Sequence, residues 1–373
     1  MTFKAGTYKQ QYQYRSFLPS LLAHPFEWQS DAVLELLSDA NRFIGELNTF
    51  ADLVPDVNFF IEMHKIKEAT TSSRIEGTRT NIDEAVLSEN HISNEKRDDW
   101  EEVRNYIRAL NYSIDRMQEL PLSMRLIKEA HAILLSGVRG ENKLPGEVRR
   151  SQNWIGGADI KSATFVPPAH EDLPDLLTDL EKFWHGETRQ LPALIRIAVS
   201  HYQFETIHPF FDGNGRMGRL LITLQLLQSE LMRKPVLYLS DFFERNRMEY
   251  YQALERVRFT DSLDHWLRFF LTGVIQIAQN SKKTFVDIGT LRYSYRERMK
   301  SLGKRGKLAK ELLLQLYSSP IVSPREAEQK LRVTAATTNR LISELEKLGI
   351  LQEMTGYSRN RLYALHEYLE IFR

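Results

Sequence analysis

HPFFDGNGRMGR, residues 208–219, places a histidine, a carboxylate, three glycines and two arginines within one short stretch. Gly213 and Gly215 let the backbone adopt conformations that are closed to other residues. Backbone N–H groups can then point into one concavity at the start of the following helix, where the helix dipole favours an anion. Arg216 and Arg219 lie one helical turn apart, so both guanidinium groups can face that concavity. The pattern predicts a site for a polyphosphate rather than for a lone carboxylate.

Two further side chains of this stretch bring reactive chemistry. Asp212 can hold Mg2+, which would bridge phosphate oxygens. His208 has a reference pKa of about 6.5 and can accept a hydroxyl proton near neutral pH. Together with the amides and arginines, these groups predict nucleotidyl transfer, in which His208 deprotonates an attacking hydroxyl. A phosphate cradle without catalysis and a purely structural histidine are the alternatives.

The composition excludes several kinds of site. The chain has no cysteine, so disulfides, thiolate metal sites and cysteine nucleophiles are ruled out. No compact pattern of histidines and carboxylates predicts a zinc site. No stretch reaches the roughly 18 apolar residues of a membrane span, and the N-terminus lacks the apolar core of a signal peptide. We therefore expect a cytoplasmic protein with no membrane partner.

Helical periodicity dominates the sequence. The expected helices cover residues 31–50, 57–73, 81–87, 100–118, 124–135, 171–184, 192–207, 220–232, 247–258 and 263–280. Residues 146–170 differ, because their paired glycines, the stretch ATFV and two adjacent prolines predict a short hairpin that ends in a rigid loop. Residues 220–232 are apolar almost all round, which is typical of the central helix of a bundle. The predicted fold is mainly α, a helical bundle with a β-hairpin flap.

The C-terminal tail differs from the body in charge and pattern. Residues 281–373 carry 18 Lys and Arg against 10 Asp and Glu, a net of +8 that leaves −7 on the other 280 residues. Helices are expected at 308–317, 324–331 and 335–348, followed by strands at 350–354 and 361–364. This order resembles a winged helix-turn-helix domain, whose third helix would present Thr334, Thr337, Thr338, Asn339 and Arg340, and whose wing would present Tyr357, Ser358, Arg359 and Arg361. DNA is one candidate partner of the tail, and dimerisation or target docking is the alternative.

Residues 208–219 also resemble the Fic family signature, HPFx[D/E]GNGRxxR, and agree with it at every defined position. The resemblance extends over about residues 70–271 and includes PGEVRRSQNWIGG and ATFVPP, which look like the family's β-hairpin flap. It implies a protein adenylyltransferase, which transfers AMP from ATP to a Ser, Thr or Tyr hydroxyl of a target protein. It also implies that the flap aligns the target chain by strand addition.

The same resemblance assigns roles to single residues. It makes His208 the general base and Asp212 the Mg2+ ligand. Gly213, Asn214 and Gly215 would cradle the α- and β-phosphates, Arg216 would hold the β-phosphate and Arg219 the γ-phosphate. An aromatic residue of the adenine pocket corresponds to Tyr251, although Tyr250 or Tyr251 could instead belong to the core. Arg258 stands where relatives often have Asn, so the base selectivity of the pocket stays open.

Glu76 occupies an unfavourable position at the end of the predicted helix 57–77. The helix dipole disfavours a carboxylate there by roughly 0.3–1 kcal/mol, so a positive partner is expected. Arg74 and Arg79 are the nearby candidates, and Arg219 is the distant one. SSRIEG, residues 72–77, resembles the Fic inhibitory motif, [S/T]xxxE[G/N]. This resemblance implies that Glu76 pairs with Arg219 and blocks the γ-phosphate of ATP.

The sequence thus predicts three parts: an N-terminal helical region (1–118) with an inhibitory helix (about 57–77), a Fic catalytic core (119–280) and a winged helix-turn-helix domain (301–373). The predicted function is a Mg2+- and ATP-dependent protein adenylyltransferase that is inhibited by Glu76. One alternative is a DNA-binding regulator whose Fic core senses nucleotide. Others are a deAMPylase and a transferase that uses another nucleotide donor. The target protein is unknown, and self-modification and a homodimer are further options.

Overall fold

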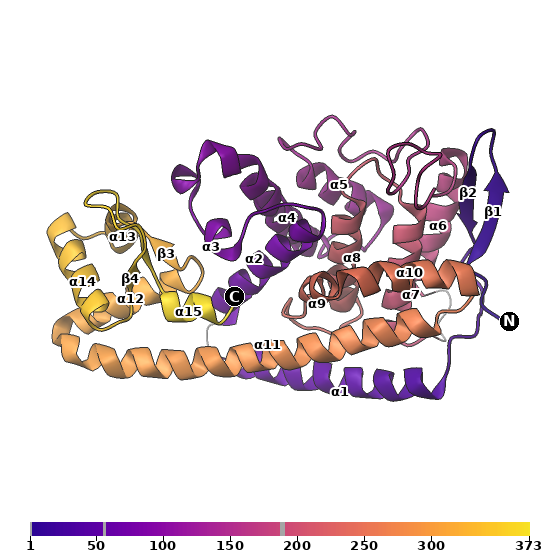
Figure 1. The fold of residues 1–373 in the computed structure, drawn as a ribbon. Coiled ribbons are helices and arrows are strands. Elements are labelled where there is room, and N and C mark those ends of the chain that lie inside the picture. Colours follow the sequence, from indigo (N-terminus) through magenta and orange to yellow (C-terminus); the bar gives the residue numbers. More distant parts are fainter. Residues whose placement is uncertain (1, 55–56, 187–190) are drawn as a thin grey trace.

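A computed structural model describes residues 2–54, 57–186 and 191–373, and it has a helical body joined to a smaller C-terminal tail (Figure 1). The helices of the body are α1 (Asp31–Leu53), α2 (Val57–Ile75), α3 (Ile82–Ala85), α4 (Arg97–Arg116), α5 (Met124–Leu134), α6 (Leu173–Trp184), α7 (Ala193–Ile207), α8 (Asn214–Gln228), α9 (Ser240–Arg245), α10 (Arg247–Thr260) and α11 (Asp264–Met299). The predicted mainly α fold is therefore confirmed. None of the helices in the described ranges combines the length and apolar character needed to cross a bilayer.

The helix α8 lies at the centre of the body and is buried along nearly its whole length. It was predicted to start at residue 220, but it begins at Asn214, inside the glycine-rich stretch. The first two turns therefore carry Arg216 and Arg219, which are buried. Helix α7 packs against α8 and places the stretch 208–213 between the two helices.

The helix α11 is longer than predicted. It was expected to end at residue 280, but it continues to Met299, and its second half buries Phe285, Ile288 and Tyr295. These residues extend the apolar stripe by whole helical turns, which explains why the helix does not stop. Figure 1 shows α11 running beneath the body, alongside α1, and reaching the tail as one continuous rod.

Two segments near the N-terminus and the flap differ from the predictions. Strands β1 (Gly6–Gln10) and β2 (Arg15–Pro19) form an antiparallel hairpin in a region that was predicted to be helical. The predicted flap hairpin, in contrast, has only the single bridge between Ile155 and Phe165 among the described residues. The N–H of Phe17 in β2 donates to the carbonyl of Val166 at 2.9 Å, so the N-terminal hairpin braces the base of the flap.

The tail contains four α-helices and a small sheet. After a 3-10 turn (Lys300–Arg305), it contains α12 (Gly306–Leu316), β3 (Ile321–Val322), α13 (Pro324–Leu331), α14 (Ala335–Lys347), β4 (Gln352–Glu353), β5 (Tyr363–Ala364) and α15 (His366–Glu370). The three strands are antiparallel in the order β3-β5-β4. Thr338, predicted to face a groove, is fully buried, because it lies on the face of α14 that packs inward. Thr334, Thr337 and Arg340 are exposed.

The tail packs directly on α2. The ring of Phe60 lies 5.3 Å from that of Tyr317, and the ring of His64 lies 5.2 Å from that of Phe372. Arg373 forms an ion pair with Asp83, 2.7 Å between Nη2 and Oδ2. Figure 1 shows the C-terminus beside α2, between the body and the tail. Helix α2 is therefore enclosed by the body on one side and by the tail on the other.

Candidate active site

The stretch 208–214 is a tight loop between α7 and α8. His208 ends α7 in the left-handed region, with φ 50°, which is a strained conformation for a non-glycine residue. Gly213 also has a positive φ, 74°, immediately before α8 begins. The side chain of Asn214 bonds twice to Phe210, accepting from its N–H and donating to its carbonyl, both at 2.8 Å. The amide of Asn214 thus closes the loop.

Two buried side chains that the sequence analysis did not single out brace this loop. The ring of His131 stacks on Phe210 at 3.8 Å, accepts from the N–H of Gly146 at Nδ1, and lies 3.0 Å from the carbonyl of Asp212 at Nε2. Burial lowers the pKa of His131 to about 4. Arg149 donates to the carbonyl of His208 at 3.0 Å and to that of Pro168 at 2.6 Å. Arg149 therefore ties the flap to the histidine.

The predicted pairing of Glu76 with Arg219 is present. Arg219 Nη2 donates to Glu76 Oε1 at 2.6 Å, and the same guanidinium donates to Oγ and to the carbonyl of Ser72, both at 2.9 Å. Arg74, one of the nearby candidates, instead lies 3.5 Å from Glu244. Burial alone would raise the pKa of Glu76, but the charge of Arg219 and its hydrogen bond outweigh that effect, so the net shift is downward. Glu76 is therefore held as a carboxylate.

The end of α2 places Glu76 by a helix-terminating turn. The N–H of Thr78 donates to the carbonyl of Ser73, and the N–H of Gly77 to that of Arg74. This is the hydrogen-bond pattern of a Schellman motif, in which Gly77 has the required positive φ, 100°. A Cβ at Gly215 would lie 2.3 Å from Glu76 Oε1, so a glycine is needed there for Glu76 to approach α8. Local sequence at both partners thus sets the contact.

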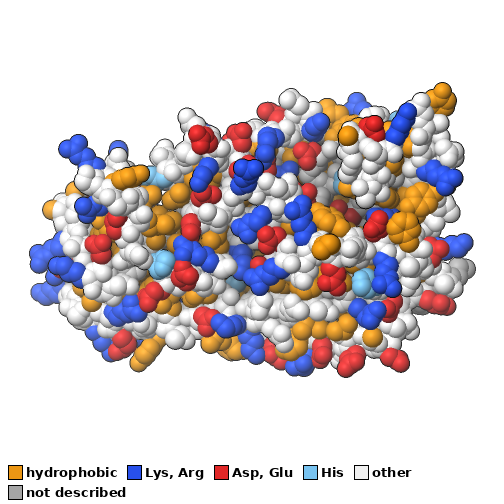
Figure 2. Space-filling model, in the orientation of Figure 1, with side chains coloured by type: hydrophobic (Ala, Val, Ile, Leu, Met, Phe, Trp, Pro, Cys, Tyr) orange, Lys and Arg blue, Asp and Glu red, His pale blue; other side chains and the backbone are white. Residues whose placement is uncertain are grey.

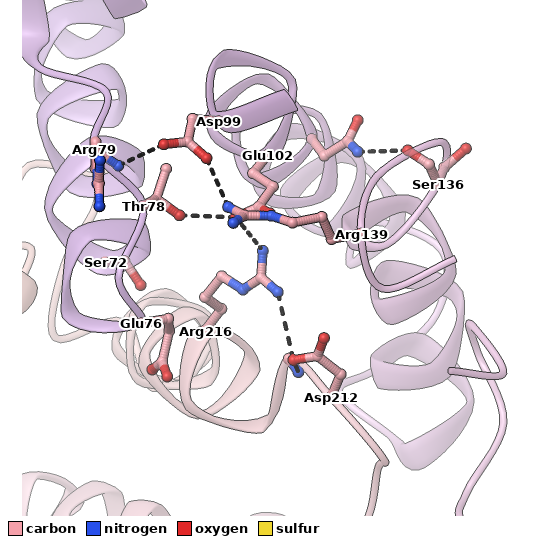
Figure 3. A network of polar contacts seen from close by, with 12 residues as sticks. Ser72, Glu76, Thr78, Arg79, Asp99, Glu102, Ser136, Arg139, Asp212 and Arg216 are labelled. Atoms are coloured by element: carbon pink, nitrogen blue, oxygen red, sulfur yellow. Dashed lines mark hydrogen bonds and ion pairs between the residues drawn. The ribbon is translucent and has the colours of Figure 1, made fainter. Parts of the chain in front are cut away.

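Arg216 does not face the same way as Arg219. It extends between Glu102 of α4 and Asp212, with N–O distances of 3.6 Å and 3.8 Å (Figure 3). Its Nε and Nη1 atoms are buried and make no hydrogen bond. A buried guanidinium with unused donors next to a helix N-terminus suits a phosphate oxygen.

Asp212 offers a site that fits Mg2+. Its side chain is 45% exposed and lies at the start of the phosphate cradle. No cluster of three or more histidines and carboxylates occurs in the part of the chain that the structure describes. Mg2+ bound by one or two carboxylates and by substrate phosphates needs no such cluster. The donor set around Asp212 therefore suits a nucleotide-bound Mg2+.

One cavity of about 340 Å3 brings several of the predicted residues together. Glu76, His208, Gly215, Arg219 and Tyr251 all line it, and so do Ile155 and Phe165 of the flap. Its size falls within the range of small-ligand pockets. The cavity lining does not include the other predicted residues of this stretch, Asp212, Gly213, Asn214 and Arg216.

The histidine in this cavity is kept neutral. Burial, followed by the charge of Arg149, lowers the pKa of His208 to about 4. Its Nδ1 atom is buried and has no hydrogen-bond partner. Since the imidazole is uncharged near neutral pH, a ring nitrogen is free to accept a proton.

Tyr250 and Tyr251 have different roles. The hydroxyl of Tyr250 bonds to Nε2 of His201 at 2.8 Å, and both residues are buried in the core. Tyr251 is 44% exposed and faces the cavity. Arg258 lies 4.0 Å above the ring of Phe165, at the flap end of the same cavity.

The sequence analysis missed two acidic residues that line the cavity, Glu205 and Glu255. Glu205, one helical turn before His208 on α7, lines the cavity, and its Oε1 is buried without a partner. Burial raises the pKa of Glu205 to about 7. The spacing of three residues from His208 was the available signal, because it places both side chains on one face of α7.

Comparison with known proteins identifies the body. A family model described as "Fic/DOC family" matches residues 121–226, and "Fic/DOC family N-terminal" matches residues 34–115. The chain is a Fic/DOC family protein. The second match covers α2 and α4, so the helix that bears Glu76 belongs to the N-terminal Fic region.

Curated relatives of this Fic protein are named protein adenylyltransferases. Protein adenylyltransferase Fic of Drosophila grimshawi is 32% identical over 134 residues, which is 35% of this chain and 26% of the relative. Protein adenylyltransferase fic-1 of Caenorhabditis briggsae is 28% identical over 181 residues, 48% of this chain and 32% of the relative. The match thus spans only about a quarter to a third of these relatives.

Solved structures agree in fold. A Fic family protein from Desulfovibrio desulfuricans G20 aligns with a TM-score of 0.59 and 19% identity, over 91% of this chain and 98% of that one. A Fic domain containing signaling protein from Bacteroides thetaiotaomicron aligns with a TM-score of 0.55 and 21% identity, over 68% and 96%. At these identities the likeness concerns the fold.

Proposed function

We propose that this Fic protein is a protein adenylyltransferase that transfers AMP from ATP to a Ser, Thr or Tyr hydroxyl of a target protein. The observation that carries the proposal is the cavity shared by His208, Arg219 and Tyr251. The names of the curated relatives support the same activity. The proposed parts are an N-terminal region (1–118), a catalytic core (119–280) and a winged helix-turn-helix tail (301–373).

In the proposed reaction, the target hydroxyl oxygen attacks the α-phosphorus of ATP. The bond from that phosphorus to the oxygen bridging to the β-phosphate breaks, and pyrophosphate leaves. A ring nitrogen of His208 accepts the hydroxyl proton. Arg219 would hold the γ-phosphate, and Arg216 and the N–H groups of residues 213–215 would hold the others. Mg2+, held by Asp212, would neutralise phosphate charge when bound.

Autoinhibition by Glu76 is part of the proposal. Glu76 occupies the guanidinium that the γ-phosphate needs, and Arg219 is only 2% exposed, so no second face is open to the nucleotide. ATP would then bind with its phosphates out of line for attack. Removing the carboxylate frees Arg219 and should activate transfer.

The test uses purified protein, Mg2+ and ATP labelled at the α-phosphate. We compare the wild type with Glu76→Gly and with Glu76→Gly/His208→Ala. Label on Glu76→Gly protein or on an added target, weak in the wild type and absent from the double variant, is the expected result. Transfer that persists without His208 would contradict its role as base. Absence of label in every variant, with ATP binding intact by calorimetry, would favour a nucleotide sensor.

DNA binding by the tail is the second candidate function. A polar groove is lined by Arg325, Asn339, Arg359 and Arg361 of the tail together with Asn90 and His91 of the body, and Glu326 also lines it. Lys and Arg side chains gather over the tail edge in Figure 2. The positive charge and exposed polar groups suit phosphate contacts. A gel shift with duplex DNA tests this function, since binding to the phosphate backbone weakens steeply as salt rises.

The labelling assay also distinguishes two other activities of the core. A deAMPylase would remove bound AMP, and a transferase with another donor would prefer another labelled nucleotide.

A further inference from the structure

The turn that follows α2 is tied to α4 by two carboxylates. Thr78 Oγ1 donates to Glu102 Oε2 at 2.7 Å, and the backbone N–H of Arg79 donates to Asp99 Oδ2 at 2.8 Å (Figure 3). Arg139 joins the two carboxylates, donating from Nε to Glu102 at 2.9 Å and from Nη2 to Asp99 at 2.6 Å. Side-chain bonds therefore fix the turn to α4 directly after the residue that contacts Arg219.

Glu102 is the centre of this network. Its side chain is 8% exposed, and its Oε2 atom, which accepts from Thr78, also lies 3.6 Å from Nη1 of Arg216. Figure 3 shows Glu102 facing Arg139 on one side and Arg216 on the other. One buried carboxylate thus contacts both the inhibitory turn and the phosphate cradle. Hydrogen bonds to a buried charge are stronger than neutral ones and are costly to break.

Release of Glu76 by movement of the backbone would displace this turn. Glu76 follows the last residue of α2, Gly77 has φ 100°, and Thr78 is the first buried side chain after them. The backbone can pivot at Gly77, but Thr78 is bonded to Glu102 only two residues from the inhibitory carboxylate. A displacement of the backbone that carries Glu76 and Thr78 away from α8 therefore strains or breaks the bond from Thr78 to Glu102.

We propose that Glu102 is a positioning residue for autoinhibition: by accepting the hydrogen bond of Thr78, it keeps Glu76 on Arg219. The inference rests on the proposed function and specifies how that function is regulated. Glu102 acts through Thr78 and does not itself contact Glu76. Loss of the bond shifts the population of the turn toward the released state.

The first test replaces Thr78 with the isosteric Val, in the wild type and in the Glu76→Gly background. Thr80→Val is the matched control, because Thr80 is equally buried at 3% exposure and has no bond to Glu102. We expect Thr78→Val to raise the transfer rate about tenfold, the equivalent of one charge-assisted hydrogen bond. In the Glu76→Gly background the same change should have no effect, since no inhibitory carboxylate is left to release. A merely structural Thr78 would instead lower the rate in both backgrounds.

The second test measures hydrogen exchange and does not depend on transfer activity. The N–H groups of Gly77 and Thr78, bonded to carbonyls of α2, should exchange about tenfold faster in Thr78→Val than in Thr80→Val. Glu102→Gln should do the same, because it removes the negative charge that strengthens the bond from Thr78 and replaces one of the two accepting oxygens with a donor. The N–H groups of Gly77 and Thr78 should exchange no faster in the double variant Thr78→Val/Glu102→Gln than in Glu102→Gln. The two changes act on the same hydrogen bond, so their effects do not add.

The exchange results separate the two levels of the proposal. Faster exchange with no transfer in any variant, Glu76→Gly included, would contradict the proposed adenylyltransferase activity but would support the proposed role of Glu102 in holding the turn. Equal exchange rates in Thr78→Val and Thr80→Val, or additive effects of Thr78→Val and Glu102→Gln, would contradict the proposed role of Glu102. Thermal melting of each variant shows whether the fold is intact.

Discussion

At the scale of single residues, His208 combines backbone strain with a buried, neutral ring. Its φ of 50° turns the chain out of α7 and aims the imidazole into the cavity. Burial makes protonation of the ring unfavourable and holds its pKa near 4. The residue therefore keeps its proton-accepting form well below neutral pH.

This pKa predicts the pH dependence of transfer. In the Glu76→Gly background, titration of His208 should not change kcat/KM between about pH 7.5 and about pH 6, because the buried ring has a pKa of about 4. A free imidazole would already titrate at about 6.5 and would lower the rate within this range. The rate should fall only as the pH approaches 4, where His208 gains its proton. A pH–rate profile with circular dichroism at each pH checks this prediction. A fall centred at about 6.5 would show a solvated histidine instead.

The Glu76–Arg219 pair predicts a difference between ATP and ADP. In Glu76→Gln, the buried guanidinium of Arg219 keeps its bonds to Ser72 but loses its counter-charge. We expect a loss of stability of about 1–3 kcal/mol, which a γ-phosphate can restore. Thermal melting should therefore show a larger upward shift with ATP than with ADP in Glu76→Gln, and equal shifts in the wild type.

A matched control for this pair is Glu244→Gln, which removes the exposed partner of Arg74. An exposed ion pair contributes about 0–1 kcal/mol, so this variant should melt like the wild type with either nucleotide. If ATP and ADP shift the Glu76→Gln protein equally, the γ-phosphate does not reach Arg219.

The sequence predicted that Glu76, Arg219 and His208 lie close together, because each belongs to a stretch that matches a family motif, SSRIEG or HPFFDGNGRMGR. It did not predict Glu205, Arg149 or Glu102, whose motif signal is weak. Arg149 donates to a backbone carbonyl, Glu102 lies near the distant charge of Arg216, and Glu205 Oε1 has no hydrogen-bond partner. Such surroundings arise from the packing between helices. Residues defined by their surroundings are visible only in three dimensions.

At the scale of elements, α2 is shaped by two neighbours rather than by its own pattern. It buries residues all around its axis, including Glu68, which accepts from Tyr106 at 2.9 Å and from Ser240 at 2.6 Å. A helix with one exposed face can be read from periodicity. Periodicity did predict a helix at residues 57–73, but α2 is buried on nearly all sides, so the pattern did not show what the helix packs against, and its inhibitory role was predicted from SSRIEG.

The contact between α2 and the C-terminus predicts that the tail stabilises the inhibited state. Phe372 is 2% exposed and packs against the ring of His64. Phe372→Ala should cost about 3 kcal/mol of stability through the cavity it leaves. It should also speed hydrogen exchange in α2 and raise the basal transfer rate, because α2 loses part of its support.

The control for this prediction is Phe259→Ala, since Phe259 is 69% exposed. That variant should leave melting and exchange unchanged. Loss of stability in Phe372→Ala without faster exchange in α2 would show that the tail contact supports the tail alone.

The other elements show which sequence signals suffice. The ends of α5 and α7 were predicted to within a residue or two, because apolar periodicity and a capping Ser123 mark them. The hairpin of β1 and β2 was missed, since four of the five residues of β1 are exposed and Phe17 of β2 packs against Phe165 of the flap, which is distant in sequence. The flap itself was predicted as a hairpin, but its glycines with positive φ favour an irregular loop.

At the scale of the whole molecule, the unpredicted feature is the contact of the tail with the body. The ion pair of Arg373 with Asp83 joins residues 290 positions apart, and no local pattern reports such a contact. Helix α11 makes it possible, because its continuous course brings the basic tail back against α2. Charge asymmetry indicated a separate tail, but not its place.

Four buried histidines predict how the whole fold responds to acid. Burial lowers the pKa of His64, His131 and His208 to about 4 and that of His201 to about 3. Unfolded histidines take up protons at about pH 6.5, so below that pH the unfolded state binds more protons than the folded one. Stability is therefore full only well above about pH 6.5, begins to decline as the pH approaches that value, and declines further through the window down to about 4.

Urea unfolding at about pH 7.5, 6.5, 5.5 and 5.0 measures this decline, because these pH values lie above, at and below the reference histidine pKa of about 6.5. The midpoint should fall slightly between the first two, because unfolded histidines are already half protonated at about pH 6.5, and it should fall more steeply below them. Replacing His201, which bonds Tyr250 and the carbonyl of Gly218, with Gln keeps a polar side chain but removes the titrating group. The variant should start less stable and lose less between pH 6.5 and 5.0 than the wild type. An unchanged pH dependence would mean that carboxylates, not His201, set the acid limit of the fold.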